Sequence, residues 1–377
     1  MPCGVADRQR QAEDAAYRRQ GEKRWRLSLI PLIRQSGQGL AGSSSAVGFA
    51  TLGLVAKILV TGGAGYIGSH TRYFLEKQGH SVIVVDNLSR GYADSVPPGM
   101  LRNLDLNETQ HVTEILLQEQ VEAVIHFAAY ISVGESTTHP ELYFTNNVGS
   151  TLSLFSAMIA AGVNKLVFSS TAATYGIPTK VPITEDQPYA PINPYGESKV
   201  MVEKILDWLD KYRNFRGIRL RYFNACGAEP QAGLGERHDP ETHLIPLILK
   251  AVQTGKPVTL FGDDYPTPDG TCIRDYIHVS DLADAHIVAV EHLLNGGASD
   301  VFNVGTGKGQ SVKDVLAAVE RVTGQKAPHT IGPRREGDPP SLVADSTKLQ
   351  TKLGWKPKRA ALDRIVGDAW AFAERKT

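Results

Sequence analysis

The strongest constraint on this chain is a glycine-rich turn that joins a short apolar run to the start of a helix. Residues 59–68 read LVTGGAGYIG, and Gly62, Gly65 and Gly68 recur every three residues. The first such glycine permits a sharp turn, the second lets the backbone approach a pyrophosphate, and the third lets the helix pack closely on the sheet. The helix N-terminus adds unpaired N–H groups and a positive dipole end. This turn predicts a dinucleotide site, although an ordinary strand-to-helix turn shows the same spacing when nothing else supports it.

A second apolar run supports the dinucleotide. Residues 81–85 read SVIVV and are followed by Asp86, at about the separation expected for a carboxylate that hydrogen-bonds the adenosine ribose. A 2′-phosphate beside this carboxylate would be repelled, so Asp86 favours NAD over NADP. We therefore expect NAD as the cofactor.

Strand and helix patterns alternate regularly through the first part of the chain. Residues 122–127 and 165–170 have the composition of buried strands, and residues 108–120 and 140–161 have helical periodicity. Residues 101–106 are expected to add a short strand. This alternation predicts an α/β fold with a doubly wound parallel sheet (Rossmann) and a ligand crevice at the carboxyl ends of the strands.

The length of the chain predicts more than one domain. The 377 residues exceed one ordinary domain, and the strict alternation fades after the first 224 of them. We expect residues 57–224 to form mainly the NAD-binding domain and residues 225–377 mainly a smaller α/β substrate-binding domain. Residues 301–305 are expected to return to the main sheet as a strand, and Ser311 is expected to cap a helix over residues 312–322.

Residues 1–56 differ in composition from the rest of the chain. They are rich in arginine and then in glycine and serine, and their apolar patch at residues 27–33 contains Pro31 and is too short to span a bilayer. We expect a disordered extension. A translation start placed upstream of the working one, with the protein beginning near Val55, gives the same pattern.

Charge and cysteine content bear on the partners and the compartment. The 40 basic and 40 acidic residues cancel, which argues against nucleic acid or a membrane surface as a partner and for a small ligand. Cys3, Cys226 and Cys272 are too far apart for a zinc site or a disulfide framework. We expect a cytoplasmic protein without a transmembrane run and without a cluster of metal ligands.

A tyrosine and a lysine one helical turn apart carry the catalytic prediction. Residues 195–199 read YGESK and open a helical pattern that continues to Tyr212, so Tyr195 and Lys199 lie on one face. Thr171 ends the preceding strand pattern and faces the same crevice, although a hydroxyl-rich turn would look alike. Downstream of a dinucleotide turn, the tyrosine and lysine are identified as the proton-transfer pair of the short-chain dehydrogenase/reductase superfamily.

The charge of Lys199 has a definite purpose in such a pair. A tyrosine base needs its pKa lowered from about 10 towards 7, which takes about 4 kcal/mol of phenolate stabilisation. One positive charge at about 5 Å supplies about 3 kcal/mol at an effective dielectric constant near 20. Lys199 alone falls short, whereas Lys199 together with the charge of oxidised nicotinamide suffices. We therefore expect Tyr195 to be the strongest base when NAD⁺ is bound.

From about Lys57 to its end, the chain resembles the UDP-glucose 4-epimerase group of the extended short-chain dehydrogenases. The matching stretches fall in both halves of the chain, which makes the resemblance more specific than the glycine turn. They are residues 61–70, 126–129, 133–136, 221–224, 261–267, 269–271, 274–279 and 334–338.

The resemblance implies that the chain interconverts UDP-glucose and UDP-galactose by transient NAD-dependent oxidation at C4 of the sugar. Tyr195 would be the acid and base, Thr171 would take the place of a serine that binds the sugar O4, and Lys199 would hold the nicotinamide ribose. The residues implied for the cofactor are Gly62, Gly65, Tyr66, Ile67, Gly68, Asp86, Asn87, Asp105, Leu106, Phe127, Ala128, Ala129, Asn147, Ser169, Tyr195, Lys199 and Tyr222. The residues implied for the UDP-sugar are Thr171, Tyr195, Asn224, His243, Leu244, Phe261, Arg274, Arg335, Asp338 and Leu342.

The chain departs from the family pattern at several positions. Ile131 stands where some relatives have a lysine near the cofactor phosphates, and Leu104 stands where a glycine is usual. Ala172 and Ala173 stand where sugar 4,6-dehydratases carry an Asp-Glu pair. Without those carboxylates, elimination of water has neither an acid nor a base.

Two other functions fit parts of the pattern. One is a related UDP-sugar 4-epimerase for pentoses, uronic acids or N-acetylhexosamines, and the other is a non-catalytic NAD-binding sensor. A sensor gives no reason for Thr171, Tyr195 and Lys199 to occur together. In the family a tyrosine at the position of Leu342 leaves no room for an N-acetyl group, so the smaller leucine predicts some acceptance of UDP-N-acetylglucosamine.

The resemblance also implies a homodimer. In the family the helix that carries Tyr195 and the helix from about Pro140 pair across a two-fold axis. An apolar stripe runs along the first of these helices, and it lies either in that interface or against the core of the chain itself. Its members are Val200, Ile205, Leu206 and Leu209.

Overall fold

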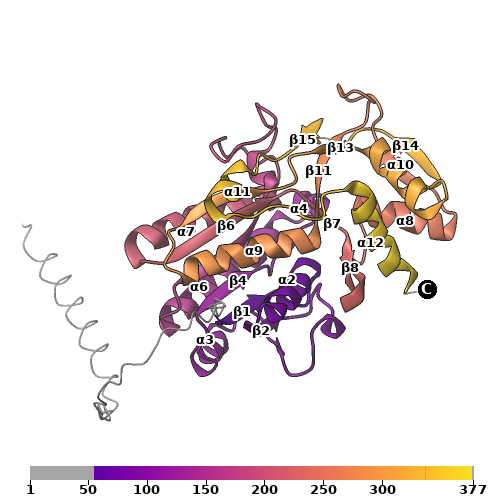
Figure 1. Cartoon of the computed structure of the whole chain (residues 1–377). Coiled ribbons are helices and arrows are strands. Elements are labelled where there is room, and N and C mark those ends of the chain that lie inside the picture. Colours follow the sequence, from indigo (N-terminus) through magenta and orange to yellow (C-terminus); the bar gives the residue numbers. More distant parts are fainter. Residues whose placement is uncertain (1–54, 336, 376–377) are drawn as a thin grey trace, which may run out of the picture. The chain divides into compact units, whose positions relative to one another are not determined.

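The computed structural model describes residues 55–335 and 337–375, so that Cys3 and the predicted extension up to residue 54 lie outside it. Its main element is a seven-stranded sheet with the strand order β12-β6-β5-β4-β1-β2-β3. Every neighbouring pair of strands is parallel (Figure 1), which confirms the predicted doubly wound α/β fold. The strands are β1 (Lys57–Thr61), β2 (Ser81–Asp86), β3 (Leu101–Asn103), β4 (Ala123–His126), β5 (Lys165–Thr171), β6 (Arg216–Tyr222) and β12 (Asp300–Val304).

Helices cover both faces of this sheet because its strands carry apolar side chains on both sides, as is typical of parallel sheets. On β1, Ile58 and Val60 belong to one core, whereas Leu59 between them belongs to a second core on the opposite face. The first core is closed by α2 (Tyr66–Lys77), α9 (Val279–Leu294) and α11 (Thr347–Leu353). The second core is closed by α3 (Thr109–Gln118), α6 (Ser150–Ala161) and α7 (Pro194–Arg213).

The apolar stripe predicted on α7 faces the core of the chain. Val200 and Leu206 are 1% and 2% exposed. Ile205 and Leu209 are partly buried and pack against the second core. This stripe is therefore occupied within the chain.

The order of the strands fixes the position of the ligand crevice. The chain runs outward from β1 to β3, returns to β4 beside β1, and then runs outward in the other direction. At this reversal the loops after β1 and β4 diverge, which leaves a crevice at the carboxyl ends of the two strands. The glycine-rich turn follows β1 and Phe127 follows β4, so both lie at the crevice.

The later residues form a third core around β10, β11 and three helices. Ser311 caps α10 through a capping box with Asp314, which confirms the helix predicted there. The helices are α8 (Leu244–Thr254), α10 (Val312–Thr323) and α12 (Leu362–Glu374). The strands are β7 (Asn224–Cys226), β8 (Ala228–Glu229), β9 (Leu234–Gly235), β10 (Val258–Phe261), β11 (Ile273–His278), β13 (Gly309–Ser311), β14 (His329–Gly332) and β15 (Ser341–Leu342).

Two elements differ from the prediction. The helix predicted over residues 140–161 is divided into α5 (Pro140–Tyr143), a π-helical turn η2 (Phe144–Gly149) and α6. The strand predicted over residues 101–106 ends at Asn103, so Asp105 lies in the following loop. The remaining short elements are η1 (Ala93–Ser95), α4 (Val133–Thr138), η3 (Ala172–Tyr175) and η4 (Pro230–Ala232).

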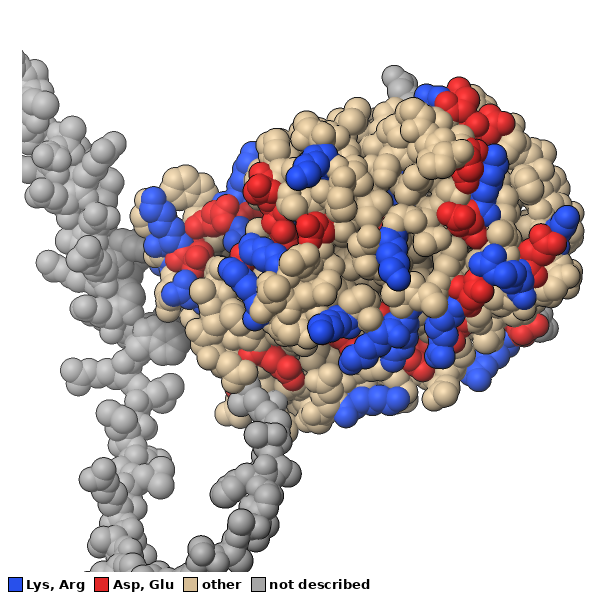
Figure 2. Space-filling model, turned by 45° about the horizontal axis from the view of Figure 1, so that its top comes forward, with Lys and Arg blue, Asp and Glu red and all other residues tan. Residues whose placement is uncertain are grey.

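The surface carries both signs of charge. On the face drawn in Figure 2, acidic and basic side chains lie next to one another, in keeping with the balanced composition. Within the described ranges, no helix is long and apolar enough to cross a membrane.

A buried ion pair joins the sheet to α7. The side chains of Arg221 on β6 and Glu203 on α7 are 3% and 0% exposed, and Arg221 Nη2 lies 2.7 Å from Glu203 Oε2. Arg221 Nε also donates to Glu203 Oε1 at 3.0 Å, and Tyr189 donates its hydroxyl to Oε2 at 2.9 Å. Because both charges are removed from water, each depends on the other for its stability.

We expect Glu203→Ala to lower the free energy of unfolding by about 3–5 kcal/mol, because it leaves the Arg221 guanidinium buried without a counter-charge. The matched control is Glu320→Ala, which removes the partner of Lys326 in an exposed pair with an N–O distance of 3.9 Å. That change should stay within about 0.5 kcal/mol of the parent. Urea denaturation followed by circular dichroism measures both, and equal losses in the two variants would contradict the structural role of Glu203.

Candidate active site

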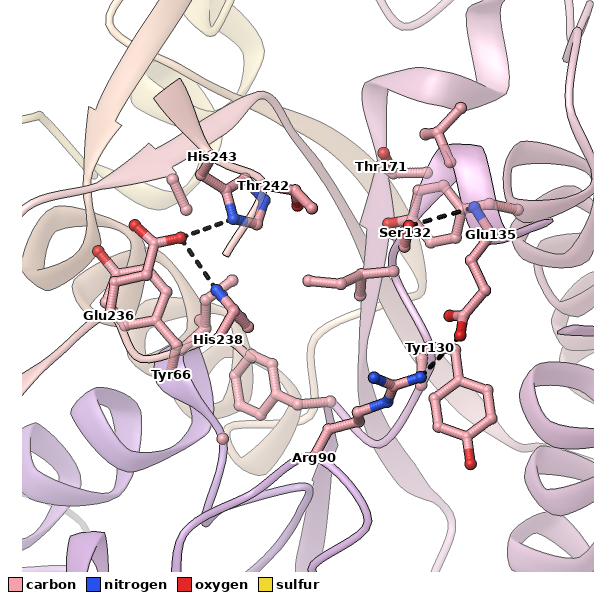
Figure 3. A pocket seen from close by; sticks show the side chains of 18 of the residues that line it. Tyr66, Arg90, Tyr130, Ser132, Glu135, Thr171, Glu236, His238, Thr242 and His243 are labelled. Carbon is pink, nitrogen blue, oxygen red and sulfur yellow. Dashed lines mark hydrogen bonds and ion pairs between the residues drawn. The ribbon is translucent and has the colours of Figure 1, made fainter. Parts of the chain in front are cut away.

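A cavity of about 1350 Å³ opens at the carboxyl ends of the sheet strands. Its walls come from the glycine-rich turn, the ends of β5 and β6, and loops of the later residues. Figure 3 shows Thr171 on one side of this cavity and Tyr66, His238 and His243 on the other. Segments from both halves of the chain thus meet at one site.

The glycine-rich turn has the geometry of a phosphate cradle. Gly62 has a φ of +69°, and a Cβ there would lie 2.5 Å from the backbone nitrogen of Ala128. A Cβ on Gly68 would lie 2.2 Å from the carbonyl oxygen of Gly62. Gly65 caps α2 without a side-chain hydrogen bond. The first N–H groups of α2 therefore have no intrahelical or capping partner and are free to bind an anion from the cavity.

The adenosine end of the site is formed after β2. Asp86 ends that strand, and its carboxylate accepts hydrogen bonds from the backbone N–H groups of Ala64 at 2.9 Å and Leu88 at 2.8 Å. Burial raises the pKa of Asp86, and these two hydrogen bonds oppose the rise. Asn87 donates its amide to the carboxylate of Asp105 at 2.8 Å, which joins two further predicted cofactor residues.

Tyr195 and Thr171 both lie on the cavity wall, at the start of α7 and the end of β5. Asn193 caps α7 by accepting a hydrogen bond from the N–H of Gly196 at 2.8 Å, so Tyr195 falls in the first turn of the helix. Tyr195 and Thr171 are each 8% exposed. Burial raises the pKa of Tyr195, and a hydrogen bond with Thr171 lowers it.

Lys199, which is predicted to hold the nicotinamide ribose, lies behind the cavity wall and does not line the cavity. Its Nζ donates to the carbonyl of Ser169 at 2.9 Å and lies 6.0 Å from the ring centre of Tyr195. Burial lowers the pKa of Lys199 to about 7, and the carboxylate of Glu203 opposes that shift. Without the cofactor, burial outweighs the hydrogen bond with Thr171, so the pKa of Tyr195 lies above its ordinary value. That Tyr195 is the strongest base when NAD⁺ is bound stays a prediction.

Asn147 is also placed differently from the prediction. It lies on the π-helical turn η2 and is 2% exposed. Its Oδ1 accepts a hydrogen bond from the N–H of Tyr130 at 2.8 Å, and its Nδ2 donates to the Tyr130 carbonyl and to Ser198. Asn147 thus holds the loop after β4 against α7 and does not line the cavity.

Arg274 with Asp338, and Arg335 with Phe261, form the other end of the cavity. Arg274 on β11 donates to the carboxylate of Asp338 and to the carbonyl of Ile273 at 2.7 Å. The guanidinium of Arg335 lies 4.2 Å from the ring centre of Phe261. Guanidinium groups bind phosphate oxygens in a bidentate manner, so this end of the cavity suits a diphosphate.

The structure brings nearly all of the predicted residues to the cavity wall, with Asn147 and Lys199 as the exceptions. The predicted residues that line it are Gly62, Gly65, Tyr66, Ile67, Gly68, Asp86, Asn87, Asp105, Leu106, Phe127, Ala128, Ala129, Ser169, Thr171, Tyr195, Tyr222, Asn224, His243, Leu244, Phe261, Arg274, Arg335, Asp338 and Leu342.

Two features of the cavity wall were not predicted from the sequence. One is Arg90, which lies on the rim and forms an ion pair of 2.8 Å with Glu135 (Figure 3). The other is a cluster of metal-ligand types, which the sequence analysis did not expect. Its four members alternate over residues 236–243 as E-x-H-x-x-E-x-H. This spacing matches neither the helical nor the cysteine-based patterns of metal-binding motifs. They are Glu236, His238, Glu241 and His243.

Comparison with known proteins gives one consistent relationship. Residues 58–305 match the model of the NAD dependent epimerase/dehydratase family. The chain is 52% identical over 318 residues to the UDP-glucose 4-epimerase of Lactobacillus helveticus, an overlap of 84% of this chain and 96% of that relative. It is also similar to the crystal structure of UDP-glucose 4-epimerase from Brucella ovis in complex with NAD. The TM-score is 0.81 at 44% identity, and the match covers 84% of this chain and 98% of the other.

A further solved relative is named for two sugars. The UDP-Glc/GlcNAc 4-epimerase of Campylobacter jejuni superposes with a TM-score of 0.74 at 41% identity. The match covers 85% of this chain and 99% of that one.

Proposed function

Because the chain belongs to the NAD-dependent epimerase/dehydratase family, we propose that its cavity is the active site of a UDP-glucose 4-epimerase. The enzyme interconverts UDP-glucose and UDP-galactose and keeps NAD as its resident cofactor. The observation that carries this function is the arrangement of one cavity: Thr171 and Tyr195 lie between a phosphate cradle at one end and Arg274 with Arg335 at the other.

The residues present fit NAD. The close approach of Gly62 to Ala128 and the uncapped start of α2 suit a pyrophosphate, and Asp86 at the end of β2 suits a ribose without a 2′-phosphate. When bound, NAD supplies a reversible acceptor for the hydrogen on C4 of the sugar. Tyr222 and Ser169, which share a hydrogen bond at the ends of β6 and β5, border the place for its nicotinamide.

The proton chemistry belongs to Tyr195. Its phenolate takes the proton from the sugar O4 as C4 is oxidised, and the resulting hydroxyl returns the proton to O4 once the 4-keto sugar has turned over. Thr171 holds O4 by a hydrogen bond, and Lys199 orders the end of β5 through the Ser169 carbonyl. Arg274 and Arg335 retain the UDP while the sugar rotates, because the diphosphate charge stays on the same oxygens throughout.

We expect Tyr195→Phe to lower kcat by about 10² to 10⁴, the usual contribution of a positioned acid and base, with UDP-sugar binding nearly unchanged. The matched control is Tyr73→Phe on α2, which removes a hydroxyl from a side chain that contacts Lys77 outside the cavity. The measurement is steady-state turnover of UDP-galactose together with UDP binding by calorimetry. Near-normal turnover in Tyr195→Phe would remove this residue from the mechanism.

The range of sugars is set at Leu342 in this proposal. Leu342 pairs with Arg274 between β15 and β11 and packs against the small core around Ala172 and Phe223. It therefore lies between the diphosphate anchor and the catalytic threonine. The similar enzyme from Campylobacter jejuni is a UDP-Glc/GlcNAc 4-epimerase, which is in keeping with a broader sugar range.

We expect the parent to turn over UDP-N-acetylgalactosamine beside UDP-galactose, and Leu342→Tyr to lower the ratio of the two kcat/KM values by about 10- to 200-fold. This is the range that loss of space for one small group produces in an apolar pocket. Leu342→Met is the control, because it keeps the volume and should leave the ratio unchanged. Leu342 would not determine the range of sugars if kcat/KM of the parent were already thousands of times lower for the acetylated sugar. The same conclusion would follow if Leu342→Tyr left the ratio of the two kcat/KM values unchanged.

We also propose that the enzyme is a cytoplasmic homodimer. The described cysteines, Cys226 and Cys272, are free thiols, which suits a reducing compartment. The interface would be the outer surface of α6 and α7, because apolar side chains recur there at helical spacing: Leu152, Ile159, Met201, Trp208 and Tyr212 are 37–67% exposed. Trp208 and Tyr212 stack with ring centres 5.7 Å apart, and aromatic side chains of this kind are enriched in interfaces.

We expect static light scattering at micromolar concentration to give the mass of a dimer for the parent and of a monomer for Trp208→Glu, because a charge in the centre of an apolar interface is left without a partner. Ile331→Glu is the control, since Ile331 is apolar and 47% exposed but lies on β14. A parent of monomer mass, or a dimer unaffected by Trp208→Glu, would refute this interface.

A further inference from the structure

Four potential metal ligands converge in the loop between β9 and α8. Nδ1 of His243 lies 2.8 Å from Oε1 of Glu236 and 3.2 Å from Oε1 of Glu241. Nδ1 of His238 lies 3.2 Å from Oε1 of Glu236 and 3.6 Å from Oε2 of Glu241. One donor atom from each residue can be chosen so that all four lie within 4.8 Å of one another. Figure 3 shows Glu236 contacting both imidazoles.

These separations match the edges of a coordination tetrahedron. Zinc binds histidine nitrogen and carboxylate oxygen at about 2.0–2.2 Å, which places neighbouring donors in a tetrahedral site about 3.3–3.6 Å apart. The four nitrogen–oxygen contacts of 2.8, 3.2, 3.2 and 3.6 Å fall around that value, with Glu241 using a different oxygen for each histidine. The set with one donor atom per residue lies within 4.8 Å, a wider spread than these edges, so the side chains must draw together to surround an ion.

One of the nitrogens faces the cluster without a hydrogen bond. Nδ1 of His238 is buried and has no hydrogen-bond partner, although Oε1 of Glu236 is only 3.2 Å away. A buried nitrogen without a hydrogen bond calls for an explanation such as an ion at that point. The side chains of Glu236 and Glu241 are 6% and 13% exposed, and those of His238 and His243 are 21% and 40% exposed.

The surrounding groups hold the four side chains in place. Glu241 Oε1 accepts hydrogen bonds from the backbone N–H groups of Thr242 and His243, each at 2.8 Å. The ring of Tyr66 meets the ring of His238 edge-on, with centres 6.3 Å apart. The hydroxyl of Tyr66 is itself fixed by donating to the carbonyl of Gly227 at 2.7 Å. Such outer contacts orient ligands before an ion arrives.

We propose that Glu236, His238, Glu241 and His243 form a structural zinc site with two imidazole nitrogens and two carboxylate oxygens as ligands. All four tetrahedral positions are then filled by protein, as in structural rather than catalytic zinc sites. Two carboxylates neutralise the double charge of the ion. Zinc is favoured over magnesium because imidazole suits zinc, whereas magnesium prefers octahedral oxygen ligands and retains water.

The position of the site indicates what the ion does. The ligands occupy the segment immediately before α8, and His243 adjoins Leu244, the first residue of that helix. On the other side the cluster contacts Tyr66, the first residue of α2 after the glycine-rich turn. The ion therefore ties the loop that borders the substrate cavity to the helix that carries the cofactor turn. Its role is to position this loop, separate from the chemistry at Tyr195.

The test uses the full chain without an affinity tag, freed of metal with EDTA and then dialysed. Isothermal titration with ZnCl₂ should show one equivalent bound per chain, and MgCl₂ should show none. Zinc X-ray absorption should report four nitrogen and oxygen neighbours, two of them imidazoles. Glu236→Gln and His238→Gln should each weaken zinc binding by at least about 10-fold, since even outer-shell changes have effects of that size.

The matched controls are Glu108→Gln and His111→Gln. They alter an exposed Glu-His pair with an N–O distance of 2.9 Å at the start of α3, and they should leave zinc binding unchanged. If the parent binds no zinc at 10-fold excess over micromolar protein, or if both cluster variants bind it like the parent, the proposal is wrong. The four groups then form only a network of ion pairs. The zinc titration of the parent does not require any variant to fold. The proposal can therefore be refuted even if both cluster variants fail to fold.

Discussion

The close approach between Gly62 and the start of the loop after β4 is the constraint on which the site depends. A side chain at Gly62 would collide with Ala128 and Phe127, whose backbone atoms lie within 3 Å of the position that its Cβ would take. The turn is further held by the hydrogen bond from the N–H of Gly62 to the Val85 carbonyl at 2.9 Å. Three strand ends, those of β1, β2 and β4, are thereby fixed around one turn. The start of α2, the carboxylate of Asp86 and the wall at Phe127 all take their positions from it.

A second constraint links the catalytic helix to the sheet. Glu203 lies one turn after Lys199 on α7 and is paired with Arg221 on β6. Arg221 in turn donates to the hydroxyl of Tyr175 at 2.9 Å, and Tyr175 donates to Asn303 on β12 at 2.7 Å. These buried groups thus form a hydrogen-bonded chain from α7 through β6 to β12. The same carboxylate opposes the loss of charge on Lys199, so one network serves both the fold and the site.

Local patterns in the sequence predicted the parts of the fold that depend on neighbouring residues. The glycine spacing, the alternation of strands and helices, the cap at Ser311 and the pair Tyr195 and Lys199 are all visible within a few residues. The exceptions depend on partners far along the chain. The amide of Asn147 is used by Tyr130 and Ser198, and the stripe on α7 is covered by the sheet. The four side chains in residues 236–243 form a cluster only because the backbone of this loop folds back on itself. Hydrophobic periodicity in the sequence does not predict such a turn.

The two ends of the cavity are built by different kinds of structure. The chemistry at Thr171 and Tyr195 rests on the central sheet, both faces of which are covered by a packed apolar core. The sugar wall and the diphosphate anchor rest on β11 and β15, a short strand pair with Arg274 and Leu342 in register. Asp338 contacts Arg274 and is joined to Leu342 by only three intervening residues. A change in the path of that short segment would therefore shift anchor and sugar wall together while the catalytic pair stayed in place. Substrate range can thus vary in such a fold without any change in the groups that move the proton.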